Sequence, residues 1–142
     1  MENIPILGFR DPVSSWTHLL AAAAALLGSI YLIKKGRGSN VRVFSLVVYS
    51  LSLVFLFAMS GVYHLLDQGL ARDVLQRLDH AGIWVLIAGT FAPTHVILFR
   101  GPWRWLILMI VWVIAITGLV LEVVYFKTFP EWLATTLFLG LG

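Results

Sequence analysis

Long apolar runs dominate this sequence, and they decide what the chain can fold into. A helix that crosses the ~30 Å hydrocarbon core of a bilayer needs about 20 mostly apolar residues. Four stretches are long enough: 15–33, 43–66, 78–99 and 103–126. A fifth apolar stretch begins at Glu131 and reaches Gly142, which at about 12 residues is too short for a span. The sequence therefore predicts an all-α, polytopic transmembrane bundle of four complete helices and the start of a fifth.

The composition excludes the other broad classes of protein. Hydrophobic residues make up 60% of the chain and charged residues 12%, with a mean hydropathy of +0.92. Soluble domains are about 45–50% apolar and about a quarter charged, and disordered chains are polar. We find no soluble domain, linker or periodic repeat, so we treat residues 1–142 as a single transmembrane domain surrounded by membrane lipids.

The charged residues argue against nucleic acid as a partner. Ten Lys and Arg against seven Asp and Glu give a net charge of +3, but the basic residues lie at the ends of the apolar runs. That is where anionic headgroups and the positive-inside rule place them. The first and third breaks between helices hold six basic residues, and the N-terminus with the second and fourth breaks holds four. This bias favours an outside N-terminus, and no soluble partner is identifiable.

Ionisable residues inside a membrane are functional candidates by default. Because successive helices alternate in direction, the N-terminus and the second and fourth breaks share one membrane face. His18 lies early in the first helix, His64 late in the second, and Asp79 and His80 at the start of the third. We expect these four in one leaflet, whereas His95 lies towards the opposite end and is excluded.

Polar residues of the second helix form a stripe that predicts its inward face. At about 100° per residue they fall within an arc of ~120°, with Ser60 and His64 one turn apart. The stripe consists of Ser45, Tyr49, Ser52, Ser60, Tyr63 and His64.

These residue types suit zinc chemistry. The chain has no cysteine, so a metal would need His, Asp or Glu. A neutral imidazole is a good zinc ligand, and zinc lowers the pKa of bound water towards ~7. Asp79 is then the candidate general base or water-orienting group. We expect a zinc-assisted hydrolysis that is reached from within the lipid.

Each of these residues also has a simpler interpretation. His64 suits an interhelical hydrogen bond, Ser60 suits packing or a bond to its own helix, and Asp79 suits a first-turn acid favoured by the helix dipole. His18 and His80 suit a solvated interface. Asp11 reads equally as a helix cap, Glu122 is expected to pair with Lys127 or to snorkel, and five tryptophans are expected near helix ends as an aromatic belt. They are Trp16, Trp84, Trp103, Trp105 and Trp132.

Three segments resemble the hemolysin III family, the bacterial branch of the progestin and adipoQ receptors, in a superfamily that includes alkaline ceramidases. They are D-P-V-S-S-W-T-H at 11–18, S-G-V-Y-H at 60–64, and D-H-A-G-I-W-V-L-I-A-G-T-F-A-P at 79–93. The resemblance runs in order over nearly the whole chain. It implies a seven-helix protein of the bacterial inner membrane, of which this chain lacks the last helices. The animal receptors of the superfamily have the N-terminus inside, so the orientation stays open.

The resemblance also implies a zinc ion held by three histidines. The histidine of the family's S-x-x-x-H motif corresponds to His64, a metal ligand, and the serine of that motif to Ser60. The aspartate that holds the zinc-bound water corresponds to Asp79, and Asp79 and Ser60 are the expected catalytic residues. The other two histidines belong to an H-x-x-x-H motif in helix seven, which nothing here matches. His18 and His80 are the substitutes that this chain offers.

Three functions are therefore expected as alternatives. The first is a zinc-dependent intramembrane hydrolase of lipid amides, of the ceramidase type. The second is a non-catalytic receptor or regulator of membrane lipid state with structural zinc. The third is a membrane-permeabilising hemolysin. A homo-oligomer that completes the site in trans is left open.

Overall fold

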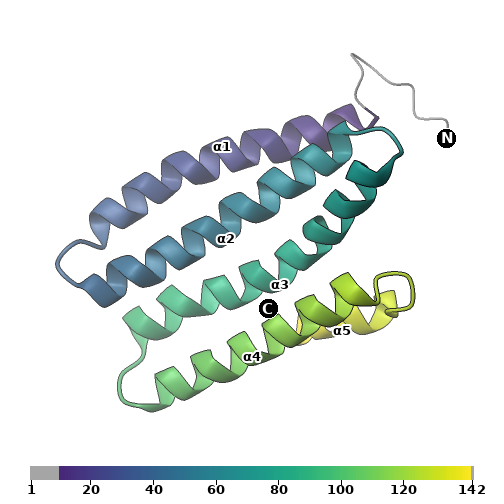
Figure 1. The fold of residues 1–142 in the computed structure, drawn as a ribbon. Helices are drawn as coiled ribbons and strands as arrows, with labels where there is room; N and C mark the ends of the chain where they lie inside the picture. Colours follow the sequence, from purple (N-terminus) through teal and green to yellow (C-terminus); the bar gives the residue numbers. More distant parts are fainter. Residues whose placement is uncertain (1–9, 142) are drawn as a thin grey trace.

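The computed structural model describes residues 10–141 and is built from α-helices alone over that range (Figure 1). Its elements are α1 (Pro12–Lys35), α2 (Asn40–Leu65), α3 (Leu70–Leu98), α4 (Trp103–Val124) and the shorter α5 (Glu131–Leu141). The first four are long and apolar enough to cross a membrane. The predicted polytopic bundle of four complete helices and the beginning of a fifth is confirmed.

Local sequence explains where the helices begin and end. α1 starts with Pro12, whose fixed φ and missing N–H suit a first helical position. Ser39 caps α2 by accepting a hydrogen bond from the Arg42 amide. Gly101 has a φ of 83° in the tight turn before α4, a conformation that residues with a Cβ rarely adopt.

α3 begins at Leu70, eight residues before the predicted start at 78. Hydropathy misses its first two turns because they are polar and carry Arg72, Asp73 and Arg77. Asp73 is the acidic residue of the first turn, and Asp79 lies in the third. Interpreting Asp79 as a first-turn acid that responds to the helix dipole is therefore wrong.

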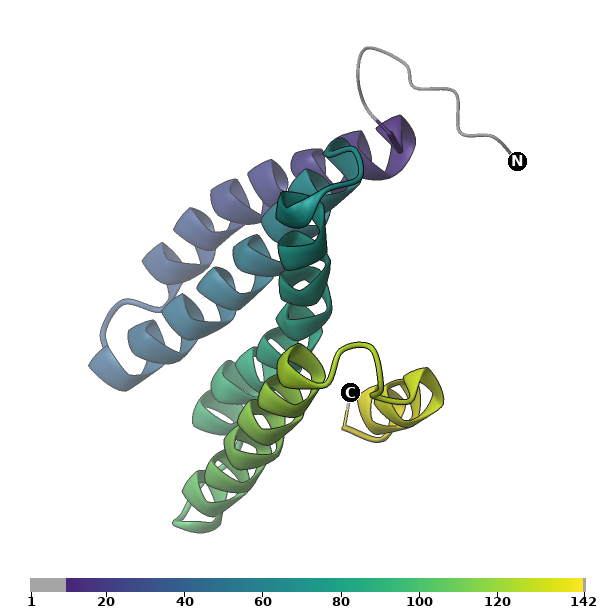
Figure 2. The ribbon, with the colours of Figure 1, turned by 45° about the vertical axis from the view of Figure 1, so that its right-hand side comes forward.

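The helices pack in a sequential layer with α3 at its centre. α1 packs on α2, α2 on α3, and α3 on α4, while α5 turns back against α3. Figure 2 shows α1 and α2 on one side of α3 and α4 with α5 on the other. A methyl group added at Gly82 would lie 2.9 Å from Leu56 of α2, so the small residues of α3 allow close helix contact.

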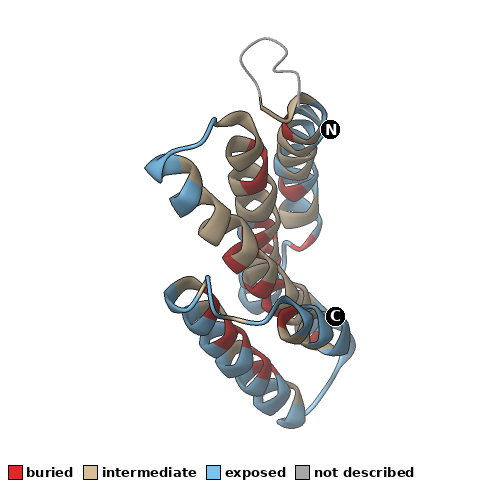
Figure 3. Ribbon diagram, turned by 90° about the vertical axis from the view of Figure 1, so that its right-hand side faces the viewer, coloured by how far each residue is buried: buried red, intermediate tan, exposed pale blue. Residues whose placement is uncertain are grey.

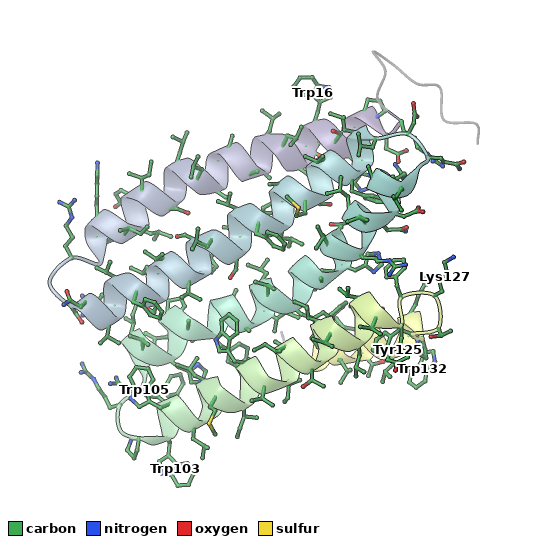
Figure 4. The ribbon with its side chains drawn as sticks, viewed as in Figure 1. Trp16, Trp103, Trp105, Tyr125, Lys127 and Trp132 are labelled. Atoms are coloured by element: carbon green, nitrogen blue, oxygen red, sulfur yellow. The ribbon has the colours of Figure 1, made fainter. Side chains whose placement is uncertain are left out.

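The buried residues lie on the inward faces, and the outward faces are apolar and exposed (Figure 3). The stripe on α2 is confirmed for Ser45, Ser52 and Ser60, which are all buried. Trp84 is fully buried in the middle of α3, where it packs with residues of α4. The other four tryptophans are exposed near helix ends, as Figure 4 shows. Trp84 was therefore wrongly assigned to the aromatic belt.

Candidate functional site

The fold brings most of the predicted site residues to one end of the bundle. The start of α1, the connection from α2 to α3 and the connection from α4 to α5 lie together at this end (Figure 1). The connections from α1 to α2 and from α3 to α4 lie at the other. His95 lies near that second end, where its ring stacks between Phe91 and Phe99. Its exclusion from the site agrees with this position.

His18 and His64 lie side by side across the contact between α1 and α2. Their ring centroids are 5.6 Å apart, with the rings nearly perpendicular at 74°. The Nδ1 atom of His18 lies 2.7 Å from Oγ of Ser60, a hydrogen bond that fixes the ring. Ser60 was predicted beside His64 on α2, and the structure gives it His18 as its partner. Ser15, fully buried on α1, donates to the Gly61 carbonyl and brings the two helices together here.

A carboxylate holds the ring of His64 from its other side. Oδ2 of Asp11 lies 3.5 Å from Nδ1 of His64 and 3.7 Å from Nη2 of Arg72. Asp11 directly precedes α1, but its side chain makes no capping hydrogen bond. Its carboxylate therefore does not act as the helix cap that the sequence suggested. When Nδ1 of His64 donates to Asp11, its Nε2 lone pair is available to a ligand.

Arg72 fixes this arrangement to the end of α2. Its Nη1 atom donates to the carbonyls of Tyr63 (3.1 Å) and Leu66 (2.6 Å). Its guanidinium lies 4.3 Å from the centroid of the Tyr63 ring. Sequence reasoning overlooked Arg72 because the residue lies in the polar first turns that were assigned to a loop.

Asp79 and His80 are neighbours in sequence but lie towards different helices. Asp79 is half-buried one turn before Gly82, which packs on α2, and within residues 10–141 it makes no hydrogen bond or ion pair. His80 instead places Nδ1 3.0 Å from Oε1 of Glu122 on α4. His80 is therefore separated from the His18–His64 pair.

Glu122 forms a second polar cluster with His80 and Trp84. Its side chain is 5% exposed, and Oε2 accepts a hydrogen bond of 2.6 Å from Nε1 of Trp84. The expected pairing with Lys127, or snorkelling to the surface, is wrong. A sequence signal was available, because Glu122 continues the spacing of the inward face of α4. The residues of that face are Val111, Ala115, Gly118 and Glu122, all of them buried.

The described residues do not by themselves complete a zinc site. Zinc takes three or four protein ligands, whereas residues 10–141 contain no group of three His, Asp or Glu side chains placed to hold a metal. The pair of His18 and His64 supplies two imidazoles, one of them braced by a carboxylate as metal-ligating histidines usually are.

Comparison with known proteins places this architecture in a family. The family model described as "Haemolysin-III related" matches residues 9–142. The chain is 32% identical over 111 residues to Hemolysin-3 of Bacillus cereus, which covers 78% of this chain and 50% of that protein. It is 29% identical over 128 residues to a Hemolysin-3 homolog of Bacillus subtilis (strain 168), covering 89% of this chain and 60% of that protein. The chain thus spans between half and three fifths of these curated relatives. No solved structure matches it.

Proposed function

This chain belongs to the haemolysin-III-related family of integral membrane proteins, and on that premise we propose that the protein is a zinc-dependent hydrolase of lipid amides. The observation that carries the proposal is the pairing of Asp11 with His64 at 3.5 Å. A carboxylate on one imidazole nitrogen is the usual support of a metal-ligating histidine, because it fixes the tautomer and the ring orientation. His18 lies beside it with its own ring fixed by Ser60.

Each residue of this end of the bundle has a role in the proposal. His64 offers Nε2 as a ligand, Ser60 orients His18, and the Asp79 carboxylate positions water and accepts its proton. Bound zinc would supply a Lewis acid for water and for the amide carbonyl. The site lies among apolar helices, so its substrates are drawn from membrane lipids, and we place the protein in a bacterial cell membrane.

The remaining ligands are proposed to come from outside the described residues. Because the chain spans about half of the length of Hemolysin-3 of Bacillus cereus, the part of the relatives that it does not span is one source. A second copy of the chain is the other. His80 is not part of this ligand set, because it lies towards Glu122 of α4 and apart from the His18–His64 pair.

Zinc content and hydrolysis, measured on the same purified protein, test the proposal. We would extract the protein from membranes without chelators, determine zinc by elemental mass spectrometry, and follow release of fatty acid from an N-acylated long-chain amino alcohol. His64→Ala is expected to lose zinc and hydrolysis, and Asp79→Asn to retain zinc and lose hydrolysis. His95→Phe, at the opposite end, is the matched control and retains both. Hydrolysis that is unchanged in His64→Ala would overturn the proposal.

A non-catalytic role in sensing or regulating membrane lipid state is the second candidate. It is favoured because residues 10–141 bring two histidines together, His18 and His64, whereas a catalytic zinc site usually has three protein ligands. Stoichiometric zinc, without product from lipid amides of any acyl length, would select this role. The name Hemolysin-3 of the relatives suggests a direct check, because red-cell lysis that persists in His64→Ala would indicate a membrane-permeabilising protein instead.

A further inference from the structure

The second polar cluster contains a buried carboxylate whose only basic neighbour at ion-pair distance, among residues 10–141, is a histidine. Glu122 is 4% exposed and accepts hydrogen bonds from Trp84 and His80. Within residues 10–141, no Lys or Arg lies at ion-pair distance from it. A carboxylate removed from water without an opposite charge is costly, and costliest inside a membrane protein. His80 supplies an opposite charge only when it is protonated, whereas a cationic ligand beside Glu122 would supply one in either state of His80.

A cavity of about 430 Å³ lies directly beside this carboxylate, between α3, α4 and α5. Its wall includes Glu122 and His80, a second carboxylate from Glu131 at the start of α5, and the aromatic rings of Phe126 and Phe138. None of its lining residues within the described part of the chain is Lys or Arg. The cavity therefore combines acidic groups with aromatic faces.

Arg77, a basic side chain of the neighbouring cavity, makes its contacts away from Glu122. Nη1 of Arg77 donates to the Val123 carbonyl at 3.1 Å, and its guanidinium lies 5.7 Å from the ring centroid of Phe126. Lys127 lines a different cavity, which it shares with Arg77. Figure 4 shows Lys127 at the connection between α4 and α5. Neither basic residue fills the place beside Glu122.

We propose that this cavity binds an organic ammonium group. Glu122 is its principal counter-ion, Glu131 adds a second negative charge at the entrance, and the phenylalanine rings face the cation. The volume lies within the usual range for small-molecule pockets. Glu122 is two residues from the end of α4, so the cavity opens near the depth of lipid headgroups. A headgroup ammonium and a water-soluble amine share this chemistry.

Calorimetry on the full chain in nanodiscs tests the proposal. The discs contain phosphatidylglycerol, which has no ammonium group, and the probe is hexylammonium, with hexanol as its uncharged counterpart. Glu122→Gln keeps the size of the side chain and one of its two acceptor oxygens, and is expected to weaken hexylammonium binding at least tenfold, because a charge-assisted bond is lost. Asp67→Asn is the matched control, since it removes an exposed carboxylate at the same end of the bundle, and it leaves the affinity unchanged.

A second variant keeps the test decisive if Glu122→Gln does not fold. Glu131 is exposed, so Glu131→Gln preserves the fold, and it is expected to weaken hexylammonium binding about two- to fivefold. Equal affinities in Glu131→Gln and Asp67→Asn would overturn the proposal. Hexanol binding as tightly as hexylammonium would also overturn it, because His80 would then supply the positive charge itself.

The lipid composition distinguishes the two sources of the ligand. Discs in which phosphatidylethanolamine replaces an uncharged glycolipid, at constant phosphatidylglycerol content, contain a headgroup ammonium at the depth of the cavity without a change in surface charge. A lower apparent affinity for hexylammonium in these discs identifies the headgroup as the occupant. An unchanged affinity identifies a water-soluble amine, and either result supports the site.

Discussion

Gly118→Ala tests the packing that supports the second polar cluster. A methyl group at Gly118 would lie 2.6 Å from Cη2 and from Cζ2 of Trp84, about 1 Å inside ordinary carbon–carbon contact. The indole cannot move away freely. It is fully buried, its N–H bonds Glu122 at 2.6 Å, and Phe138 lies 4.8 Å from it between ring centroids.

The expected cost follows from these contacts. Overpacking a filled site costs about 1–3 kcal/mol, and weakening a hydrogen bond to a charged group costs about 1.5–3 kcal/mol. The higher helix propensity of alanine returns up to about 1 kcal/mol. We therefore expect Gly118→Ala to lower the free energy of unfolding by about 1.5–5 kcal/mol.

Reversible unfolding in mixed micelles with increasing dodecyl sulfate, followed by far-UV circular dichroism, measures this loss. Gly28→Ala is the matched control, because nothing lies within 4 Å of the added methyl group and the same propensity gain applies. If the two variants were equally stable, the reasoning would be refuted. Trp84→Phe removes the outer ring, so Gly118→Ala should cost less in that background by at least about 1 kcal/mol.

Three further variants, one of them with a control variant, test other contacts. Ser15→Ala removes the buried bond to the Gly61 carbonyl and should lower stability in the same unfolding assay by about 0.6–1.7 kcal/mol, whereas Thr17→Ala, an exposed hydroxyl bonded within α1, should be nearly neutral. Arg72→Met leaves two carbonyls at the end of α2 without their donor and should cost about 1–3 kcal/mol; an unchanged melting temperature would contradict the assigned role. His95→Phe replaces a ring stacked between two phenylalanines and should shift the unfolding free energy by less than about 1.5 kcal/mol.

Hydropathy predicted the transmembrane helices because span length and apolar content are properties of a single segment. It failed at the start of α3, where Arg72, Asp73 and Arg77 make the first turns too polar to register as a span. Helical hydrogen bonds continue through those turns regardless of side-chain polarity. Alternation of helix direction was enough to assign His18 and His64 to one end of the bundle.

The partners of the polar side chains were less predictable. Ser60 pairs with His18 and Glu122 with Trp84, across 42 and 38 residues of sequence. Which side chains meet depends on the rotation of each helix about its axis, and that rotation is set by tertiary packing. Glu122 was the exception that could have been found, since its spacing from Gly118 and Ala115 places it on the inward face of α4.

The polar cluster around His64 and the polar cluster around Glu122 both include residues of α3. Asp79 and His80 are consecutive residues of α3 and project about 100° apart around its axis. His80 contacts α4. Arg72, two turns earlier on α3, contacts the end of α2. A helix turns as a unit, so any rotation of α3 that moves His80 relative to Glu122 turns Asp79 and Arg72 through the same angle. A rotation of α3 that changes the geometry of one cluster therefore changes the geometry of the other as well.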